Sequence, residues 1–276
     1  MTEELRIKQD ILECGRRLYD KGMVAANDGN ISVRLNDNEI LATPTGRSKG
    51  FMQIDELVKI DWQGRIIEGS HRPSTEMLMH LAIYQARPDV QAVVHAHPVY
   101  ATGFATANLA LDQCVAAEII TTIGSIPLAR YGTPSTHELS DAVVEVMKNA
   151  DACLMTNHGV VTCGKNVFDA YYKLERVEHY AHIIFVSRLL GGEKLLTRAD
   201  VEKLNAIRST YGTQSDANPG CRVCEDSCVG GDCACYEKKD DVAMQSLLQD
   251  VMNHHTDEND LIRSVIEKII RDAEGN

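Results

Sequence analysis

Long apolar runs, an apolar leader and an excess of basic charge are all missing from this chain of 276 residues. No stretch approaches the ~18 consecutive apolar residues that a membrane-spanning helix needs. The first ten residues, MTEELRIKQD, are charged and lack the apolar core of a secretory signal, so we expect a cytoplasmic protein. The net charge of −12 argues against a nucleic-acid partner, because such binding depends on clustered lysine and arginine.

The charge is unevenly distributed along the chain. Residues 213–276 hold 14 acidic and 6 basic side chains, whereas residues 1–212 hold 26 and 22. This change in composition predicts a domain boundary near residue 212. We expect a folded domain over 1–212, a Cys-rich linker over 213–240 and a tail of short amphipathic helices over 241–276.

The chain contains nine cysteines, which in a cytoplasmic protein are more often thiols, metal ligands or redox groups than structural disulfides. Five of them fall within fifteen positions, at Cys221, Cys224, Cys228, Cys233 and Cys235. This spacing could hold zinc or an iron–sulfur cluster. It matches no standard zinc-ribbon or ferredoxin pattern, so a linker that carries reactive thiols is an equal interpretation.

The stretch AVVHAHP, residues 92–98, ends an apolar β-branched run with two histidines. Side chains at i and i+2 of a strand point to the same face, so His95 and His97 are expected side by side, and Pro98 ends the strand. Such a pair is typical of a metal site, because neutral imidazole is the commonest metal ligand. Two hydrogen-bonded histidines at a sheet edge remain the alternative at this point.

Further elements follow from alternation, helical spacing and turn residues. Alternation predicts hairpins over 31–43 and 57–68, and strands over 119–122, 126–129 and 152–156. Helical spacing predicts helices over 2–22, 136–147, 167–190 and 197–209. Another helix opens at Pro73, with Ser74 or Thr75 as its cap and Glu76 in its first turn. The strand over 152–156 leads into His158, which puts a third histidine at a strand end.

Small polar residues in three turns could together bind an anion through neutral donors at a helix N-terminus. These residues are Gly29, Asn30, Thr45, Gly46, Ser74 and Thr75. They predict a phosphate-binding pocket if the turns converge, and plain turns if they do not.

Three histidines at strand ends and one glutamate at a helix start match the donors of a catalytic zinc site, which keeps one open position. The chain resembles the class II aldolase/adducin family, specifically its L-fuculose-1-phosphate aldolase branch. Six stretches carry this resemblance, in the order of the family: GNISVR (29–34), TPTG (43–46), PSTE (73–76), VVHAHP (93–98), TNHGVVTCGKN (156–166) and KLNAIRSTYG (203–212).

The resemblance implies an α/β fold with a central, mostly antiparallel sheet flanked by helices, assembled as a homotetramer. It implies one zinc ion held by His95, His97 and His158, with Glu76 as the acid/base beside it. It further implies that the predicted phosphate pocket holds the phosphate of a ketose 1-phosphate. The expected products are dihydroxyacetone phosphate and L-lactaldehyde.

The chain departs from the family at one catalytic position. Members of the family use tyrosines to move the proton of the aldehyde oxygen, one from a neighbouring subunit and one near the C-terminus. The first falls near Ala116, where this chain has no tyrosine, so Glu118, a water molecule or a different aldehyde preference would have to compensate. Tyr211 matches the second position, and an exposed tyrosine without a catalytic role is its alternative interpretation.

The sequence fits the other activities of the same family to different degrees. A ribulose-phosphate epimerase is disfavoured, because residues 114–123 contain no aspartate. A methylthioribulose-1-phosphate type dehydratase would keep the three histidines and the glutamate, and another ketose-phosphate aldolase would keep them as well. A purely structural or scaffolding role, as in adducin-like members, is disfavoured by the complete set of ligands.

The end of the chain has an apolar stripe, Leu261, Ile262, Val265, Ile266, Ile269 and Ile270, that a short helix cannot bury by itself. A domain, a linker and an amphipathic helix in this order resemble enzymes that carry an encapsulation peptide. We therefore expect residues 257–276 to bind a shell protein of a bacterial microcompartment, which would place the enzyme inside it. Docking on the protein's own domain or an oligomer contact is the alternative.

Overall fold

The computed structural model describes residues 2–211, and the predictions for residues 213–276 lie outside this range. The α-helices are α1 (Glu3–Asp20), α2 (Met77–Ala86), α3 (Val99–Thr106), α4 (Ala117–Thr122), α5 (His137–Met147), α6 (Val167–Leu189) and α7 (Arg198–Ile207). Two 3-10 turns complete them, η1 (Ile54–Glu56) and η2 (Arg208–Tyr211). None of these helices is both long enough and apolar enough to span a membrane.

The eight strands form one sheet in the order β4-β3-β2-β1-β5-β8-β7-β6. They are β1 (Asn30–Arg34), β2 (Ile40–Ala42), β3 (Val58–Ile60), β4 (Ile66–Glu68), β5 (Ala92–Ala96), β6 (Leu128–Ala129), β7 (Ala152–Met155) and β8 (Gly159–Gly164). Every described pairing is antiparallel except that of β6 with β7. The expected mostly antiparallel α/β fold is therefore confirmed.

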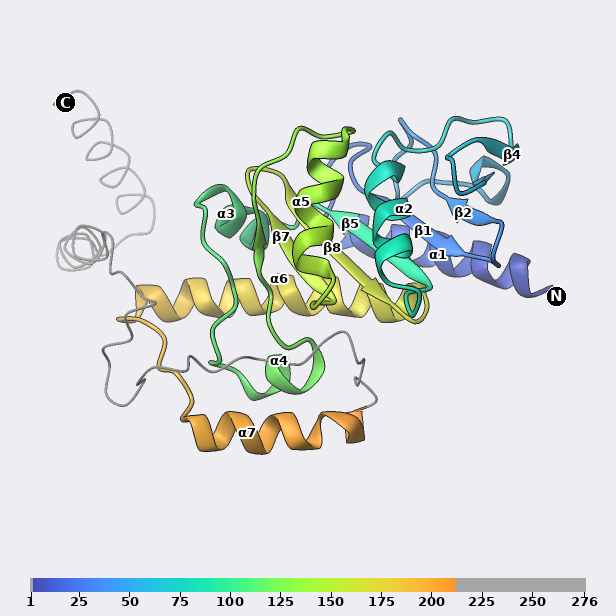
Figure 1. Ribbon diagram of the computed structural model, residues 1–276. Coiled ribbons are helices and arrows are strands. Elements are labelled where there is room, and N and C mark those ends of the chain that lie inside the picture. Colours follow the sequence, from blue (N-terminus) through green and yellow to red (C-terminus); the bar gives the residue numbers. More distant parts are fainter. Residues whose placement is uncertain (1, 212–276) are drawn as a thin grey trace, which may run out of the picture. The chain divides into compact units, whose positions relative to one another are not determined.

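Helices cover both faces of the sheet (Figure 1). On one face, α2 and α5 pack on a core that includes Val93 of β5 and Val161 of β8. On the other face, α1 and the first turns of α6 pack on a core that includes Val94 of β5. Because neighbouring residues of β5 alternate between the two cores, its odd-numbered side chains, His95 among them, point to the α2 side.

The strand expected over 119–122 is wrong, because Ala117–Thr122 is helix α4. Its β-branched residues favour strands in isolation, but their polar atoms find partners within the helix. Thr121 Oγ1 donates to the carbonyl of Ala117 at 3.0 Å, and Thr122 Oγ1 bonds back to the carbonyl of Glu118 at 2.5 Å. Ile120 packs with Val201 of α7, so tertiary contact overrides the local preference.

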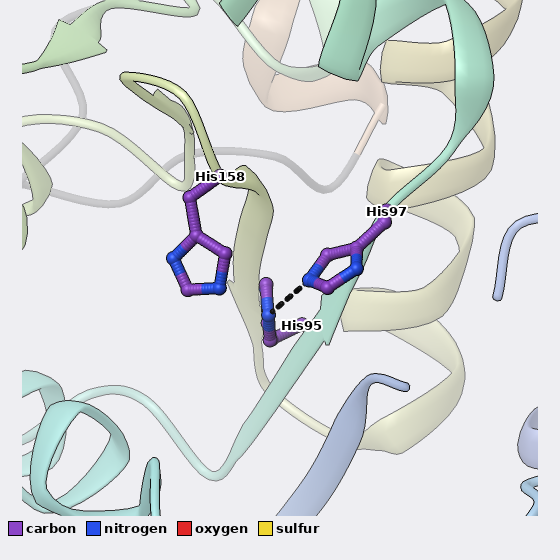
Figure 2. Close-up of side chains that lie close together, drawn as sticks. All are labelled: His95, His97 and His158. Atoms are coloured by element: carbon purple, nitrogen blue, oxygen red, sulfur yellow. Dashed lines mark hydrogen bonds between the residues drawn. The ribbon is translucent and has the colours of Figure 1, made fainter. Parts of the chain in front are cut away.

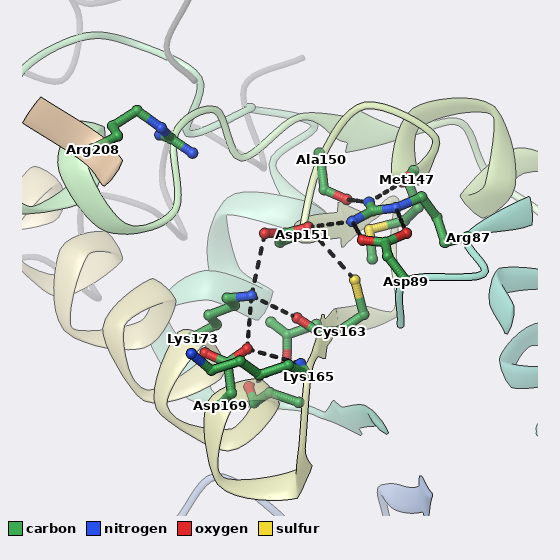
Figure 3. A network of polar contacts seen from close by, with 12 residues as sticks. Arg87, Asp89, Met147, Ala150, Asp151, Cys163, Lys165, Asp169, Lys173 and Arg208 are labelled. Carbon is green, nitrogen blue, oxygen red and sulfur yellow. Dashed lines mark hydrogen bonds and ion pairs between the residues drawn. The ribbon is translucent and has the colours of Figure 1, made fainter. Parts of the chain in front are cut away.

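A network of buried charges ties β7 and β8 to α2 and α6 (Figure 3). The Asp151 carboxylate accepts from Arg87 at 2.9 Å and from Lys173 at 3.2 Å. Lys173 also lies 3.2 Å from Asp169, and Arg87 lies 2.7 Å from Asp89. Each of the two buried cations thus contacts two carboxylates, which compensates the cost of burying it.

Candidate metal centre and phosphate pocket

Three histidines from two segments converge at one end of the sheet (Figure 2). His95 lies in β5 and His97 directly follows its last residue, and their ring centroids are 4.8 Å apart. His158 comes from the turn between β7 and β8, and its ring lies 4.8 Å from that of His95 and 5.2 Å from that of His97. One nitrogen from each ring lies within 4.8 Å of the others, which allows the three to share a metal ion.

The sheet fixes which nitrogen of His95 faces its neighbours. His95 Nδ1 lies 2.8 Å from the carbonyl oxygen of Val160 on the adjacent strand. That carbonyl only accepts, so Nδ1 carries the proton and Nε2 stays free to bind a metal. His95 Nε2 lies 3.1 Å from His97 Nε2, so both lone pairs can point at one ion.

Burial keeps His97 in the form that binds metals. Burial, together with the nearby rings of His95 and His158, lowers the pKa of His97 to about 4, so the imidazole is neutral at pH 7. The Nδ1 atom of His158 is buried without a partner among the described residues. Its other ring nitrogen, Nε2, faces the Glu76 carboxylate at 3.0 Å.

Gly159 lets the two strands approach closely enough to bring the histidines together. A Cβ at this position would lie 2.6 Å from His97 Cδ2 and 2.7 Å from the carbonyl oxygen of Ala96. Both distances are far below ordinary van der Waals contact. Only glycine therefore fits beside the histidine pair without a shift of the backbone.

Glu76 is the N-cap residue of α2 and points at two of the three histidines. Its Oε1 lies 3.0 Å from His158 Nε2, and its Oε2 lies 3.3 Å from His95 Nε2. Asn30 Nδ2 donates to Oε2 at 2.7 Å and so holds the carboxylate in place. Burial raises the pKa of Glu76, but the two histidines outweigh this effect and lower it below its usual value.

These residues fit a divalent metal ion, because three imidazoles and one carboxylate are the nitrogen and oxygen donors that zinc accepts. A buried chain of polar side chains links β1 to α2 near these residues. Ser32 Oγ lies 2.7 Å from His80 Nδ1 and 2.9 Å from the Tyr84 hydroxyl. Burial lowers the pKa of His80 to about 3, so this ring is neutral at pH 7.

A pocket of about 250 Å³ opens next to the histidines and Glu76. All six residues of the expected anion-binding turns line it: Gly29, Asn30, Thr45, Gly46, Ser74 and Thr75. The second and third turns meet through an antiparallel bridge between Pro44 and Pro73. The structure therefore brings together residues that lie more than forty positions apart.

Two glycines give the pocket its shape. Gly29 and Gly46 have φ values of 73° and 71°, which side chains rarely adopt. A Cβ on Gly29 would also lie 2.8 Å from the carbonyl oxygen of His95. The anion-binding turn thus packs directly against the strand that carries the histidine pair.

Tyr211 does not line this pocket within the described chain. It ends η2 with a side chain that is 58% exposed. The sequence interpretation also missed several pocket residues, among them Asp28, Lys49 and Ser135. Asp28 lies 3.4 Å from His97 Nδ1, and Ser135 Oγ donates to Thr75 Oγ1 at 2.8 Å. Both belong to turns, where sequence spacing gives no signal of such contacts.

Comparison with known proteins points to a single family. The model of the Class II Aldolase and Adducin N-terminal domain matches residues 9–185. A 3-oxo-tetronate 4-phosphate decarboxylase from Haemophilus influenzae is 32% identical over 204 residues, 72% of this chain and 95% of that protein. An L-fuculose phosphate aldolase from Methanocaldococcus jannaschii is 33% identical over 186 residues, 66% of this chain and 98% of its own length. A solved L-fuculose 1-phosphate aldolase has a TM-score of 0.69 at 27% identity and covers 77% of this chain and 98% of its own.

Proposed function

The chain belongs to the class II aldolase and adducin family and is an enzyme of the lyase class, and we propose that it is a zinc-dependent aldolase. Its proposed reaction cleaves a ketose 1-phosphate, such as L-fuculose 1-phosphate, into dihydroxyacetone phosphate and L-lactaldehyde. The observation that carries this proposal is the position of the three histidines and Glu76 beside a pocket lined by neutral hydrogen-bond donors.

In this proposal His95, His97 and His158 hold the metal, and the pocket holds the phosphate of the ketose. When bound, the metal would withdraw electron density from the substrate oxygens and so lower the cost of the carbanion that bond cleavage leaves. Glu76 would take up a proton from water and pass it to that carbon, because its carboxylate already faces the metal position. Asn30 keeps the carboxylate oriented through its 2.7 Å hydrogen bond.

Aldol cleavage also needs a base for the hydroxyl proton of the departing aldehyde. Residues 114–118 carry no tyrosine, and Glu118 is exposed at the start of α4. We propose that Tyr211 supplies this group across a subunit boundary, since Tyr211 is exposed and does not line the pocket of its own chain. This role depends on the homotetramer, which we also propose.

The testing experiment is a coupled assay for dihydroxyacetone phosphate released from L-fuculose 1-phosphate and L-rhamnulose 1-phosphate, with and without a chelator. The proposal expects release that stops with the chelator and returns with added zinc. Release that persists after complete metal removal would contradict it. Turnover of a ketose phosphate without dihydroxyacetone phosphate would favour the zinc-dependent dehydratase instead.

A second candidate, decarboxylation of a 3-oxo acid phosphate, is favoured by the missing tyrosine near Ala116. Loss of CO₂ from 3-oxo-tetronate 4-phosphate leaves the same kind of carbanion beside a carbonyl. Its protonation gives dihydroxyacetone phosphate, and no hydroxyl proton has to be removed. The relative from Haemophilus influenzae carries the name of this activity. Measuring the second product separates the candidates, because the aldolase releases an aldehyde and the decarboxylase releases CO₂.

For residues outside the described range the proposals rest on sequence. We propose that the domain boundary lies at 212, that 213–240 is a linker and that 257–276 binds a microcompartment shell protein. The charge shift after residue 212 and the apolar stripe near the C-terminus support this organisation. Deleting residues 257–276 should leave activity intact and abolish co-localisation with shell protein; lost activity would point to a role within the enzyme itself.

A further inference from the structure

Lys49 is a buried lysine that joins two of the turns around the pocket. Its side chain is only 2% exposed, yet it lines the pocket. Its Nζ donates to the carbonyl of Asn27 at 3.0 Å and to that of Arg47 at 2.6 Å. Asn27 precedes Gly29 and Asn30, and Arg47 follows Thr45 and Gly46 in the sequence. The ammonium therefore links the backbones of two anion-binding turns.

The backbone of Lys49 is fixed against helix α1. A Cβ on Gly15 of α1 would lie 2.7 Å from the Lys49 carbonyl oxygen. A Cβ on Gly50 would lie 2.5 Å from the ring of Tyr19. Because both glycines permit close packing on either side of it, Lys49 has little room to swing away from the pocket.

Lys49 differs from the other buried lysines in its lack of an acidic contact. Lys59 lies 3.1 Å from Glu4 and from Glu68, and Lys173 lies 3.2 Å from Asp151 and from Asp169. Within residues 2–211, no carboxylate lies within ion-pair distance of Lys49 Nζ. Its two acceptors are neutral carbonyls, and the Asp28 and Glu76 carboxylates of the same pocket attract it only from beyond ion-pair distance.

The pocket holds charged side chains as well as neutral donors, in contrast to the expectation from its turns: Lys49, Asp28 and Glu76 all line it. Lys49 is the only lysine or arginine among the described residues that line it. Burial lowers the pKa of Lys49 to about 8, so the side chain still carries its charge at pH 7. Asp28 and Glu76 offset the cost of burying this charge only in part, and an anion bound in the pocket would offset more of it.

We propose that Lys49 is a specificity-determining residue that selects substrates with a doubly negative phosphate and holds the two turns in the conformation that binds it. This inference rests on the proposed function, since that function supplies the phosphorylated substrate. The proposed function and this inference concern the same pocket, and the inference adds a positive charge to its neutral hydrogen-bond donors. Unphosphorylated ketoses gain nothing from this charge.

The test measures the binding of inorganic phosphate and of dihydroxyacetone phosphate to the zinc-loaded full chain by calorimetry. The variants are Lys49→Met, Lys49→Gln and Lys49→Arg, with Lys59→Met as a matched control for the loss of a buried lysine. Removing a charge-assisted contact should weaken the binding of both ligands by about 10- to 100-fold in the Met and Gln variants. The Arg variant should recover part of the affinity, and Lys59→Met should bind as the unmodified protein does.

A kinetic comparison adds a readout that a merely structural role would not move. In the Gln variant, KM for the phosphorylated substrate should rise by more than tenfold while kcat changes less, and binding of unphosphorylated dihydroxyacetone should stay the same. The proposal is overturned if a folded Met or Gln variant keeps its affinity for phosphate. It is also overturned if the affinities for phosphate and dihydroxyacetone phosphate fall by the same factor as the affinity for unphosphorylated dihydroxyacetone. If the Lys49→Met variant fails to fold, the Lys49→Gln variant, whose amide can still donate a hydrogen bond to the turns, tests the proposal by the same measurements.

Failure of the proposed function gives a different result. A protein that releases no dihydroxyacetone phosphate from any ketose but loses phosphate binding with Lys49 would refute the activity and support the role of Lys49. A protein that performs the cleavage while its Lys49 variants bind phosphate normally would support the proposed activity and refute the role of Lys49.

Discussion

Replacing Gly159 with alanine should separate the histidines of the metal site without removing any of them. The added methyl would lie 2.6 Å from His97 Cδ2, 2.7 Å from the Ala96 carbonyl oxygen and 3.3 Å from His95 Cε1. Relief of the first two contacts requires movements of about 1 Å, and the second involves backbone rather than a side chain. The change therefore has to displace either β5 or β8.

The magnitude of the effect follows from these contacts. Overpacking of this kind typically costs about 1–3 kcal/mol in the free energy of unfolding. A change in the groups that contact a metal-binding side chain typically lowers metal affinity by about 10- to 100-fold. We expect Gly159→Ala to show both effects, with weaker zinc binding in a protein that still folds.

The assay is competition for zinc with a chromogenic chelator, combined with urea unfolding of the metal-free protein. Gly103→Ala is the matched control, because a Cβ there meets nothing within 4 Å. In the middle of α3 that change should raise stability by about 0.5–1 kcal/mol and leave zinc affinity unaltered. If Gly159→Ala binds zinc as tightly as Gly103→Ala does, the close approach of the strands does not set the geometry of the site.

Three further predictions concern Glu76, Lys173 and Lys49. Glu76→Gln should retain zinc, measured by metal analysis, but lose at least ~100-fold in turnover; an unchanged rate would remove Glu76 from the mechanism. Lys173→Met should lower the free energy of unfolding in urea by about 3 kcal/mol, because Asp151 and Asp169 lose a buried partner, and should not change zinc affinity. The Lys49 pKa is about 8 in the folded state and about 10.5 when unfolded, so the unfolded chain binds more protons between these values. The stability of the unmodified protein should therefore rise relative to Lys49→Met from pH 8 to 10.5, by about 3 kcal/mol in total, and a constant difference would show that the lysine is not buried as a charge.

Sequence pattern predicted the parts of the fold that depend on periodicity. The long amphipathic helix expected over 167–190 is α6, Val167–Leu189, and the helix over 2–22 is α1, Glu3–Asp20. The cap of α2 was misplaced by one or two residues, since Glu76 rather than Ser74 or Thr75 is its N-cap. Backbone hydrogen bonds at a helix start depend on the local turn, which side-chain spacing does not encode.

In the candidate site, too, the sequence predicts only the residues whose positions follow from periodicity. His95 and His97 share a face because a strand repeats every two residues, so the sequence suffices to place them together. Lys49 sits in a polar loop and looks solvent-exposed from composition, whereas packing against α1 buries it. A loop residue is buried by contacts with residues distant in sequence, and the local sequence pattern contains no signal for such contacts.

The tight turn between β7 and β8 has a consequence for redesign of the enzyme. Met155 and Gly159 face each other as the last pair of the hairpin, and His158 is one of only three residues between them. An insertion or deletion there would change both the reach of His158 and the alignment of every later residue of β8 with its neighbours. Substrate range must therefore be varied in other loops, while this hairpin has to keep its length so that His158 stays beside His95 and His97.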